Sequence, residues 1–548
     1  MVEEIKKLVK GDVKSDRKTL AFYSHDTSLF EIEPKVVVFP KDKEDLSKLV
    51  NYVRERKAKQ PDLSLTARSG GSDMSGGSIN DSIILVFEKY FKKIGRIARD
   101  GTWVEPGVWY RDFERETLSH GLLFPSYPAS RELAAMGGIV ANNAGGEKSL
   151  HYGKTEKFVK AVRVILRDGR EYEFGPITKP ELDKKMRQKN FEGELYRKTY
   201  KLLNKNYALI KNAKPKVSKN STGYLAWDVW DKEKGVFDLS RLFVGSQGTL
   251  GLITEAKIAL VESKPHSGML VGYLRDIDKL GELITTVVKH RPTSFETFDD
   301  HTLKFAIRFF FQFRKTLGLA GLAKLGISFI PDIFILMRGL PKLILLVEYE
   351  GDSEEEVSKK ISELRHDLEK RGFDITLENA ATEAKSKRFW LMRRESFNLL
   401  RKNVKGDVHT APYIDDLVVP PKNLPAFLPR FRAILDKYKL LYTIAGHMGD
   451  GNFHVIPLMD FSNPNEINKI EPSLREVTDL VLKYGGSISG EHNDGLIRGP
   501  FLTQMYGEKV ANIFHEIKHI FDPDNIFNPH KKIDADWQYS RAHMRDHF

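Results

Sequence analysis

The sequence predicts a globular α+β fold that is built from more than one domain. Its 548 residues allow two to four domains. With 41% hydrophobic and 30% charged residues, the composition is that of a globular chain rather than of a disordered or collagen-like one. Strand-like apolar runs alternate with amphipathic helices along most of the chain, a pattern typical of helices layered on a sheet.

The first 260 residues combine strands, helices and glycine-rich loops. The apolar run 35–39 predicts a buried strand, and the helix expected after it carries an apolar face that runs from Leu46 to Val53 at helical spacing. Residues 161–175 contain two strand-like runs around Asp168-Gly169, which is a strong turn pair, so they predict a hairpin.

The composition changes near Lys264-Pro265, and beyond it a strand–helix–strand unit recurs over 269–298, 344–378 and 415–445. These units predict a layer of helices on a sheet. Residues 303–342 are apolar and basic together, with seven Lys and Arg against one acid. They fit either an amphipathic surface that rests on anionic lipid or a helical insertion packed on its own domain.

Composition and charge exclude several classes of function. The chain has no cysteine, which rules out disulfides, thiolate nucleophiles, cysteine-ligated zinc and any iron–sulfur cluster held by these residues. The net charge of +12 suits an anionic substrate or an anionic membrane surface. No motif for binding nucleic acid is present, so no nucleic-acid partner is expected.

The sequence predicts a cytoplasmic protein. Its first residues lack the apolar core of a signal peptide, and no stretch of about 18 uncharged apolar residues is present, so no spanning helix is expected. Peripheral contact with the inner face of the membrane through 303–342 is the open alternative.

Three glycine-rich segments lie in the first half of the chain, at 65–78, 128–153 and 243–254, and the third is expected between two strands. Glycine lets backbone amides approach phosphate oxygens closely, so such loops can cradle a phosphate; ordinary turns are the alternative. None of them is a GxGxxG or a GxxxxGK[ST] motif.

Histidines and a carboxylate gather in the last 110 residues. His447 and His454 lie in AGHMGDGNFHV, and Glu491 and His492 are adjacent in SISGEHNDG. Two histidines and one carboxylate form a standard open site for a divalent metal; Zn²⁺ suits it, and Mn²⁺ or Fe²⁺ would also fit. The alternative is that these are hydrogen-bonded core residues.

The three glycine loops and the segments near them occur in the order PKVVVFP, TARSGGSDMSGG, EPGVWYRDF, PASRELAAMGGIVANNAGG, NSTGY and VGSQGTLGLIT. This order resembles the vanillyl-alcohol oxidase/p-cresol methylhydroxylase superfamily, and within it the FAD-linked D-2-hydroxy-acid dehydrogenases. The resemblance implies a two-part FAD-binding domain over 1–263 and an α+β cap domain with an antiparallel sheet over 264–484. A C-terminal segment, 485–548, would complete the active site and return to the FAD domain.

The resemblance also implies which residues hold the cofactor. The loop from Arg68 to Asp73 would bind the pyrophosphate of FAD, and Ile253 would meet its adenine end. FAD is expected to be non-covalent, because this loop has no histidine and the chain no cysteine. The full predicted set is Arg68, Ser69, Gly70, Gly71, Ser72, Asp73, Pro128, Ser130, Gly137, Gly138, Asn142, Gly145, Gly146, Ile253 and Asn528.

The chemistry that the resemblance implies is oxidation of a 2-hydroxy acid, of D configuration, to the 2-oxo acid. The metal held by His447, His454 and Glu491 would lower the pKa of the substrate hydroxyl, His492 would take its proton, and flavin N5 would accept the hydride. Residues 389–402 predict a helix that carries Arg393 and Arg394. Arg394 aligns best with the arginine that binds the substrate carboxylate, and Asn452 would orient the pocket; two solvated arginines are the alternative.

Two departures from the family bear on the substrate. Ile414 and Ile456 stand where D-2-hydroxyglutarate enzymes have a lysine and an asparagine for a second carboxylate. This favours a lactate- or glycolate-like acid, with D-2-hydroxyglutarate as the alternative. A catalytically silent flavoprotein that binds a membrane or a partner is the alternative of another class. The electron acceptor is left open among a quinone, a cytochrome, an electron-transfer flavoprotein and an iron–sulfur partner.

Overall fold

The computed structural model describes residues 1–300, 340–380, 386–387, 389–390, 393 and 408–545. They form one eight-stranded, two four-stranded, one three-stranded and one two-stranded sheet with helices packed on them, which confirms the predicted α+β class. Arg394 and nearly all of 303–342 lie outside the described residues. Within the described residues, no helix combines the length and the apolar character needed to cross a membrane.

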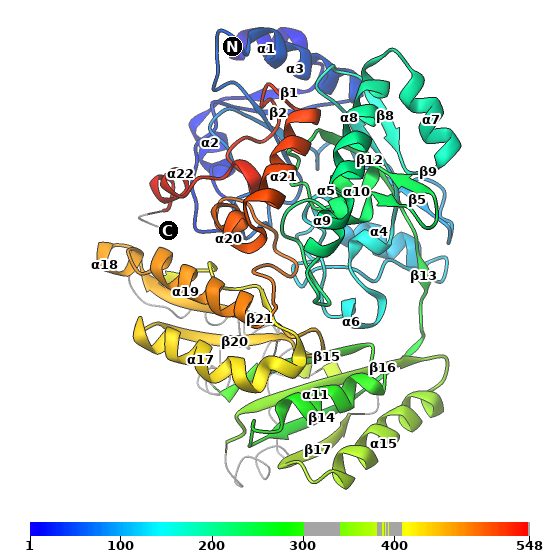
Figure 1. Ribbon diagram of the computed structural model, residues 1–548, viewed down its shortest axis with the longest axis vertical. Coiled ribbons are helices and arrows are strands. Elements are labelled where there is room, and N and C mark those ends of the chain that lie inside the picture. The colour runs from blue at the N-terminus through cyan, green and yellow to red at the C-terminus, as the bar shows by residue number, and fades with distance from the viewer. Residues whose placement is uncertain (301–339, 381–385, 388, 391–392, 394–407, 546–548) are drawn as a thin grey trace.

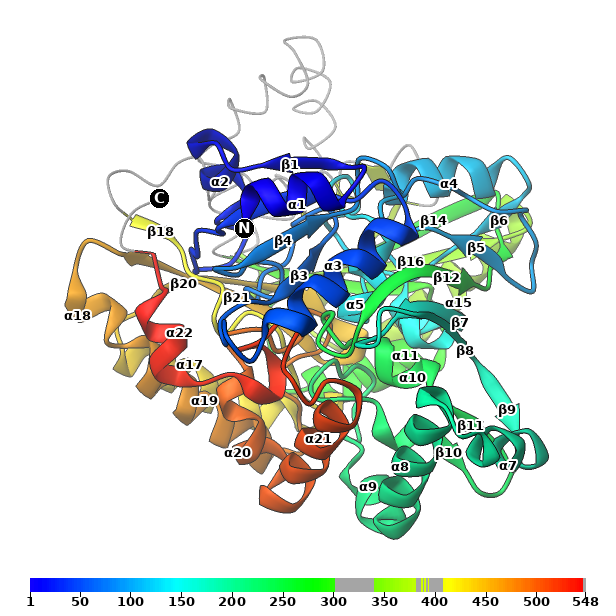
Figure 2. The ribbon, with the colours of Figure 1, turned by 90° about the horizontal axis from the view of Figure 1, so that it is seen from above.

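The N-terminal sheet has the order β1-β2-β4-β3, and its pairs β2–β4 and β3–β4 are parallel. The predicted apolar face of α3 is fully buried against these strands, because Leu46, Leu49, Val50 and Val53 share one cluster with Val36 and Leu85. Figure 2 shows α1 and α3 beside this sheet. The elements are α1 Val2–Leu8, β1 Asp12–Lys14, α2 Arg17–Tyr23, β2 Val36–Phe39, α3 Lys43–Arg56, β3 Leu65–Arg68 and β4 Ile83–Val86.

A second, antiparallel sheet has the order β5-β12-β7-β8. Its β7–β8 hairpin turns at Gly169, whose φ of 75° suits glycine, as the sequence predicts. The elements up to this hairpin are β5 Thr102–Val104, α4 Tyr110–Leu118, β6 Leu122–Leu123, α5 Met136–Asn142, α6 Ser149–Tyr152, β7 Val159–Ile165 and β8 Glu171–Phe174.

The third glycine loop differs from its prediction, because it lies between a helix and a strand instead of between two strands. The short helix α10 precedes it, and β12 follows. A short apolar run such as LFV does not by itself distinguish helix from strand, which is why the prediction was wrong here. The elements of this part are β9 Pro176–Thr178, α7 Lys179–Arg187, α8 Phe191–Lys205, α9 Tyr207–Ala213, β10 Trp230–Asp231, β11 Val236–Asp238, α10 Ser240–Phe243, β12 Leu252–Ile258 and β13 Val261–Glu262.

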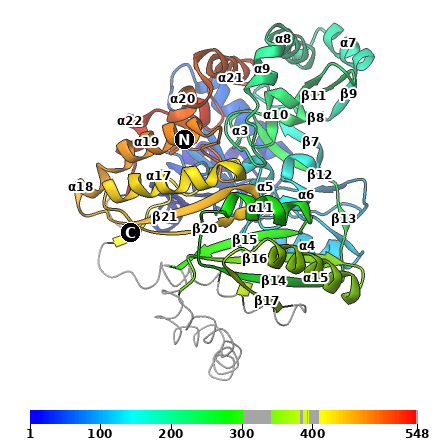
Figure 3. The ribbon, with the colours of Figure 1, turned by 60° about the horizontal axis from the view of Figure 1, so that its bottom comes forward.

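The eight-stranded sheet is antiparallel, with the order β17-β14-β16-β15-β20-β21-β18 and β19 paired to β21. Helices α11, α15, α17 and α19 pack on it, as Figure 3 shows. The strands are β14 His266–Leu274, β15 Ser294–Asp299, β16 Leu343–Gly351, β17 Ile375–Ala380, β18 Val408–Thr410, β19 Leu417–Val418, β20 Leu441–His447 and β21 Asn452–Asp460. The helices are α11 Leu280–Lys289, α15 Glu354–Lys370, α17 Leu424–Lys437, α18 Pro464–Ile467 and α19 Ile470–Lys483.

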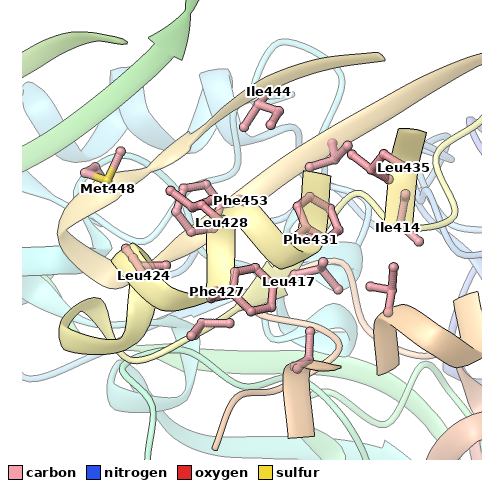
Figure 4. Close-up of a cluster of buried hydrophobic side chains, with 14 of the residues drawn as sticks. Ile414, Leu417, Leu424, Phe427, Leu428, Phe431, Leu435, Ile444, Met448 and Phe453 are labelled. Carbon is pink, nitrogen blue, oxygen red and sulfur yellow. The ribbon is translucent and has the colours of Figure 1, made fainter. Parts of the chain in front are cut away.

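The two faces of this sheet have different neighbours. On the helix side, Phe427 and Phe431 of α17 pack in one buried cluster with Ile444 of β20 and Phe453 of β21 (Figure 4). Because successive side chains of a strand point to opposite faces, the residues next to these apolar ones point away from the helices. The opposite face therefore presents polar side chains such as Glu296 of β15, next to Phe295 in the helix-side cluster.

The last part of the chain returns to the N-terminal half. The apolar face of α21, which includes Ile513, Phe514 and Ile517, is buried in one cluster with Tyr224 and Trp227. In Figure 1 the red segment that follows α21 lies beside the blue N-terminal elements, and Phe527 in it pairs with Leu65. The chain thus passes from the eight-stranded sheet back to the first half, and residues 485–495 lie on that path. The helices here are α20 Leu502–Tyr506, α21 Glu508–Phe521 and α22 Trp537–Ala542.

Candidate active site between the glycine loops and the eight-stranded sheet

A cavity of about 560 Å³ lies where the three glycine loops meet the eight-stranded sheet. The predicted cofactor residues that line it are Ser69, Gly70, Gly71, Ser72, Asp73, Pro128, Ser130, Gly137, Gly138, Asn142, Gly145 and Ile253. The predicted metal ligands and base, His447, His454, Glu491 and His492, line the same cavity. Residues more than 400 positions apart in the sequence thus face one space.

Four predicted residues, Arg68, Gly146, Asn452 and Asn528, are not among those that line the cavity in the described chain. The guanidinium of Arg68 donates to the His25 carbonyl at 2.8 Å. The amide of Asn528 donates to the carbonyls of Gly77 and Gln247 at 2.8 and 2.7 Å. Asn528 thus connects the first and third glycine loops from behind, and its direct contact with the flavin stays a prediction.

The loop geometry fits a cofactor that lies against bare backbone. A Cβ at Gly70 would meet the Leu133 carbonyl oxygen at 2.2 Å, so two walls of the cavity are in direct contact there. A Cβ at Gly138 would meet only Ser69 Cβ, at 3.7 Å, which leaves open space beside this glycine, on the cavity that it lines. Such a wall of glycines and backbone amides suits the pyrophosphate and the flat ring of FAD.

His447 and His454 are brought together by a tight connection between β20 and β21. The chain turns at Gly451, which has a φ of 66°, and the register places His454 opposite Ala445. His447 Nε2 lies 3.1 Å and His454 Nε2 3.2 Å from the same oxygen, Glu491 Oε1. Two ligand atoms at about 2.0–2.1 Å from one tetrahedral ion lie about 3.3 Å apart, so each histidine nitrogen lies at a suitable distance from Glu491 Oε1 to share a metal ion with it.

Hydrogen bonds at the far nitrogens orient both rings for ligation. His447 Nδ1 lies 2.6 Å from Glu296 Oε1, and His454 Nδ1 lies 2.7 Å from the Asp415 carbonyl oxygen. Because each Nδ1 faces an acceptor, it carries the proton in the neutral ring, and the lone pair of Nε2 faces Glu491. Lys219 Nζ lies 3.2 Å from Glu491 Oε2, which leaves Oε1 for the histidines.

His492 is held in a different way. Its Nδ1 lies 2.8 Å from Asp415 Oδ2, and the other oxygen of Asp415 is paired with Arg498. Its ring stacks on His454, with centroids 5.0 Å apart. With Nδ1 bonded to a carboxylate, Nε2 is the nitrogen left to exchange a proton in the cavity that this residue lines.

Asp416 lies near the same histidines, and most of its hydrogen bonds support the backbone around Glu491. Ligand atoms of Asp416, His454, Glu491 and His492 lie within 4.8 Å of one another. The two Asp416 oxygens, however, accept the backbone N–H groups of Glu491 and His492 and the side chains of Ser489 and Asn452. Asp416 therefore fixes the backbone of the Glu491-His492 pair, and Asn452 supports it from behind.

The electrostatics of the site favour a bound cation. Burial alone would lower the pKa of His447, but Glu296 and Glu491 outweigh it and raise that pKa to about 9. Burial likewise opposes protonation of His492, yet Asp415 and Asp416 raise its pKa to about 9. Carboxylates thus dominate around both rings, which is the charge balance that a divalent cation would offset.

Two described arginines, Arg131 and Arg393, line the cavity; Arg393 is 5% exposed and ion-paired with Glu296. The predicted substrate residue, Arg394, lies outside the described residues.

Sequence reasoning missed Glu296, Asp415, Asp416 and Lys219. Acids inside apolar strand-like runs, SFETF and YIDDLVV, were the signal that could have found the three carboxylates, since a buried charge needs a partner. Lys219 directly precedes NSTGY, without a pattern of its own.

Comparisons with known proteins bear on the family and the fold of the chain. A family model described as an FAD binding domain matches residues 34–175, and one described as the C-terminal domain of FAD linked oxidases matches 266–532. A Pseudomonas putida protein named D-2-hydroxyglutarate dehydrogenase is 29% identical over 95% of this chain and 50% of its own length. Bacillus subtilis glycolate oxidase subunit GlcD is 25% identical, over 94% of this chain and 92% of its own.

A solved structure of p-cresol methylhydroxylase shares the fold, with a TM-score of 0.67 at 17% identity over 98% of this chain and 96% of that one. The chain spans about half the length of the relatives named D-2-hydroxyglutarate dehydrogenase from Pseudomonas putida and Escherichia coli.

Proposed function

The chain belongs to the FAD-linked oxidases, and from this premise we propose that it oxidises a 2-hydroxy acid, of D configuration, to the 2-oxo acid. One observation carries the proposal. A single cavity is lined by the glycine loops, by three side chains arranged to ligate a metal, by a histidine with a carboxylate behind it and by an arginine. An alcohol oxidation that uses a flavin needs a hydride acceptor, a proton acceptor and groups that bind the substrate, and this cavity has a place for each.

The residues divide this work as follows. FAD held non-covalently by the glycine loops would supply the hydride acceptor, and a divalent ion held by His447, His454 and Glu491 would lower the pKa of the hydroxyl. Arg393, the sequence neighbour of the predicted Arg394, lines the cavity and would pair with the substrate carboxylate. A divalent ion bound next to His492 would lower the pKa of this ring from about 9, so that His492 can accept the hydroxyl proton at Nε2, and Asp415 stabilises the imidazolium that results.

The far end of the substrate faces an apolar residue. Ile456 lines the cavity two positions after His454 on β21, so both side chains lie on one face of the strand. Ile414, by contrast, is buried in the cluster beneath the helices. Neither residue can bind a second carboxylate, which favours a substrate such as D-lactate or glycolate. The names of the most similar relatives support D-2-hydroxyglutarate as the alternative substrate.

The electrons then pass to a partner outside these residues. The 548 residues contain no cysteine, so they hold no iron–sulfur relay of their own. A quinone, a cytochrome, an electron-transfer flavoprotein or an iron–sulfur partner would each serve. The zinc assignment is part of the proposal, and the donor set also suits Mn²⁺ or Fe²⁺.

Anaerobic titration of the flavin tests the reaction. Protein reconstituted with FAD and Zn²⁺ would be mixed with D-lactate, L-lactate, glycolate and D-2-hydroxyglutarate while the visible spectrum is recorded. We expect the oxidised flavin band to bleach with a D acid or with glycolate and to persist with L-lactate. A flavin that binds but that none of these acids reduces would contradict the proposal and favour the catalytically silent flavoprotein.

A variant of the base separates chemistry from binding. His492→Gln should keep FAD bound while the rate of flavin reduction falls by about 10²–10⁴. Tyr442→Phe is a matched control, since Tyr442 lies on β20, the strand that carries His447, and is not among the residues that line the cavity. An unchanged reduction rate in His492→Gln would exclude this residue as the base.

A further inference from the structure

Glu296 contacts two functional side chains of the cavity at once. It lies on β15, is completely buried, and faces the site from the side of the sheet opposite to the helices. Its Oε1 accepts the Nδ1–H of His447 at 2.6 Å, and its Oε2 is ion-paired with Arg393. Glu296 thus connects a proposed metal ligand to Arg393, which also lines the cavity.

A fully buried carboxylate is costly unless its charge is compensated, so its position needs an explanation beyond packing. Neighbouring positions on the same face of β15, Ser294 and Phe298, are neutral. The charge of Glu296 is compensated by Arg393, and the bond to His447 keeps the proton of that ring on Nδ1. A carboxylate behind a ligating histidine also makes the ligating nitrogen more basic.

We propose that Glu296 is a positioning residue for the metal site, which fixes His447 with Nε2 toward Glu491 and is itself held by Arg393. This inference rests on the proposed function, because it takes His447 as a metal ligand. It goes beyond that function by assigning a role to an acid that is not itself one of the proposed metal ligands. Glu296 strengthens metal binding through His447, and it competes with an incoming carboxylate for Arg393.

Glu296 should raise the affinity for the metal and lower the affinity for a carboxylate at Arg393. A residue that only supports the structure would change both affinities in the same direction. Replacing Glu296 by Gln keeps the size of the side chain and removes its charge. Metal affinity should then fall by about 10–100-fold, the usual effect of losing such an outer partner. Affinity for a carboxylate at Arg393 should be unchanged or higher, because a competing negative charge has gone.

Binding measurements on the FAD-loaded protein test this without turnover. Zn²⁺ affinity would be measured by competition with a coloured chelator, and pyruvate affinity by its perturbation of the flavin spectrum in zinc-free protein. The matched control is Glu350→Gln on the adjacent strand β16, where Glu350 is paired with Lys148 and touches no residue of the cavity site. We expect weaker zinc binding in Glu296→Gln alone, with pyruvate affinity at or above that of the unmodified protein.

A double-mutant cycle shows whether Glu296 acts through His447. His447→Gln should weaken zinc binding, and adding Glu296→Gln to it should cause little further loss, since the residue that Glu296 positions is gone. Additive losses would overturn the proposal, as would zinc binding in Glu296→Gln within twofold of the unmodified protein. Should Glu296→Gln fail to retain FAD, Glu296→Asp keeps the charge and is expected to weaken zinc binding less than tenfold.

The failure of this inference is distinct from the failure of the proposed function. If the unmodified protein binds no divalent metal, both the proposed metal site and the proposed role of Glu296 are wrong. If it binds zinc and Glu296→Gln binds it equally well, only the role of Glu296 falls. A parallel loss of zinc and pyruvate affinity would also count against it, because that is the pattern of a collapsed pocket.

Discussion

Two adjacent glycines of α5 should respond oppositely to the same added methyl group. A Cβ at Gly138 would meet only Ser69 Cβ, at 3.7 Å, which is ordinary contact, and Gly138 lines the cavity. A Cβ at Gly137 would instead meet Pro106 Cβ at 2.4 Å and Ser69 Oγ at 2.7 Å. The first substitution thus alters the cavity, and the second alters the packing of the protein.

The magnitudes follow from these contacts. Alanine is favoured over glycine by about 0.8–1 kcal/mol in a helix, so Gly138→Ala should raise the free energy of unfolding of the FAD-free protein by up to about 1 kcal/mol. The same methyl group stands where the cofactor should lie, so FAD affinity should fall by at least about tenfold, equivalent to about 1.4 kcal/mol. Gly137→Ala should lower the free energy of unfolding by about 1–3 kcal/mol, because its neighbours are close-packed.

Both quantities can be measured on one preparation. FAD-free protein would be unfolded in urea, and FAD would be titrated back while its fluorescence is followed. Gly138→Ala is expected to be more stable without FAD and weaker in binding it, whereas Gly137→Ala is less stable from the start. Undiminished FAD affinity in Gly138→Ala would refute the placement of the cofactor against this face of α5.

Three further predictions concern catalysis, pH and packing. Asp415→Asn should lower the rate of flavin reduction by at least about 100-fold with FAD still bound, since the carboxylate behind His492 and the partner of Arg498 are lost; a rate within a few-fold of normal would argue against it. Burial raises the pKa of Glu348 from 4.5 to about 7, so its ionisation costs folding free energy that is absent near pH 4, grows as the pH rises from about 4.5 to about 7, and stays constant above that. Glu348→Gln should therefore stabilise the protein by about 1–3 kcal/mol near pH 8 and by little near pH 4, and equal effects at both values in urea unfolding would disprove this reasoning. Phe431→Ala, in the core beneath α17, should cost about 3–5 kcal/mol of unfolding free energy, and a loss below 1 kcal/mol would mean that the cluster is loosely packed.

Much of the fold was predictable because its signals are local. The apolar face of α3 and the hairpin turn at Gly169 depend on residues within a few positions of each other, and the structure places them as predicted. The first strand of the unit expected over 415–445 is limited to β19, Leu417–Val418. The preceding residues Asp415 and Asp416 are not part of this strand. Asp415 is bonded to the ring of His492, and Asp416 accepts the backbone N–H of His492, contacts that form only in the assembled site.

The sequence by itself determined the chemical inventory: the glycine loops, the two histidine motifs and the adjacent Glu491-His492 pair. These features are recognisable because flavin and metal chemistry need particular residue types at particular short spacings. Only the tertiary structure decided how they are supported. Glu296 and Lys219 lie about 150 to 270 positions from the residues they hold, and a buried charge is assigned a role by its partners across the fold rather than by its neighbours in the chain.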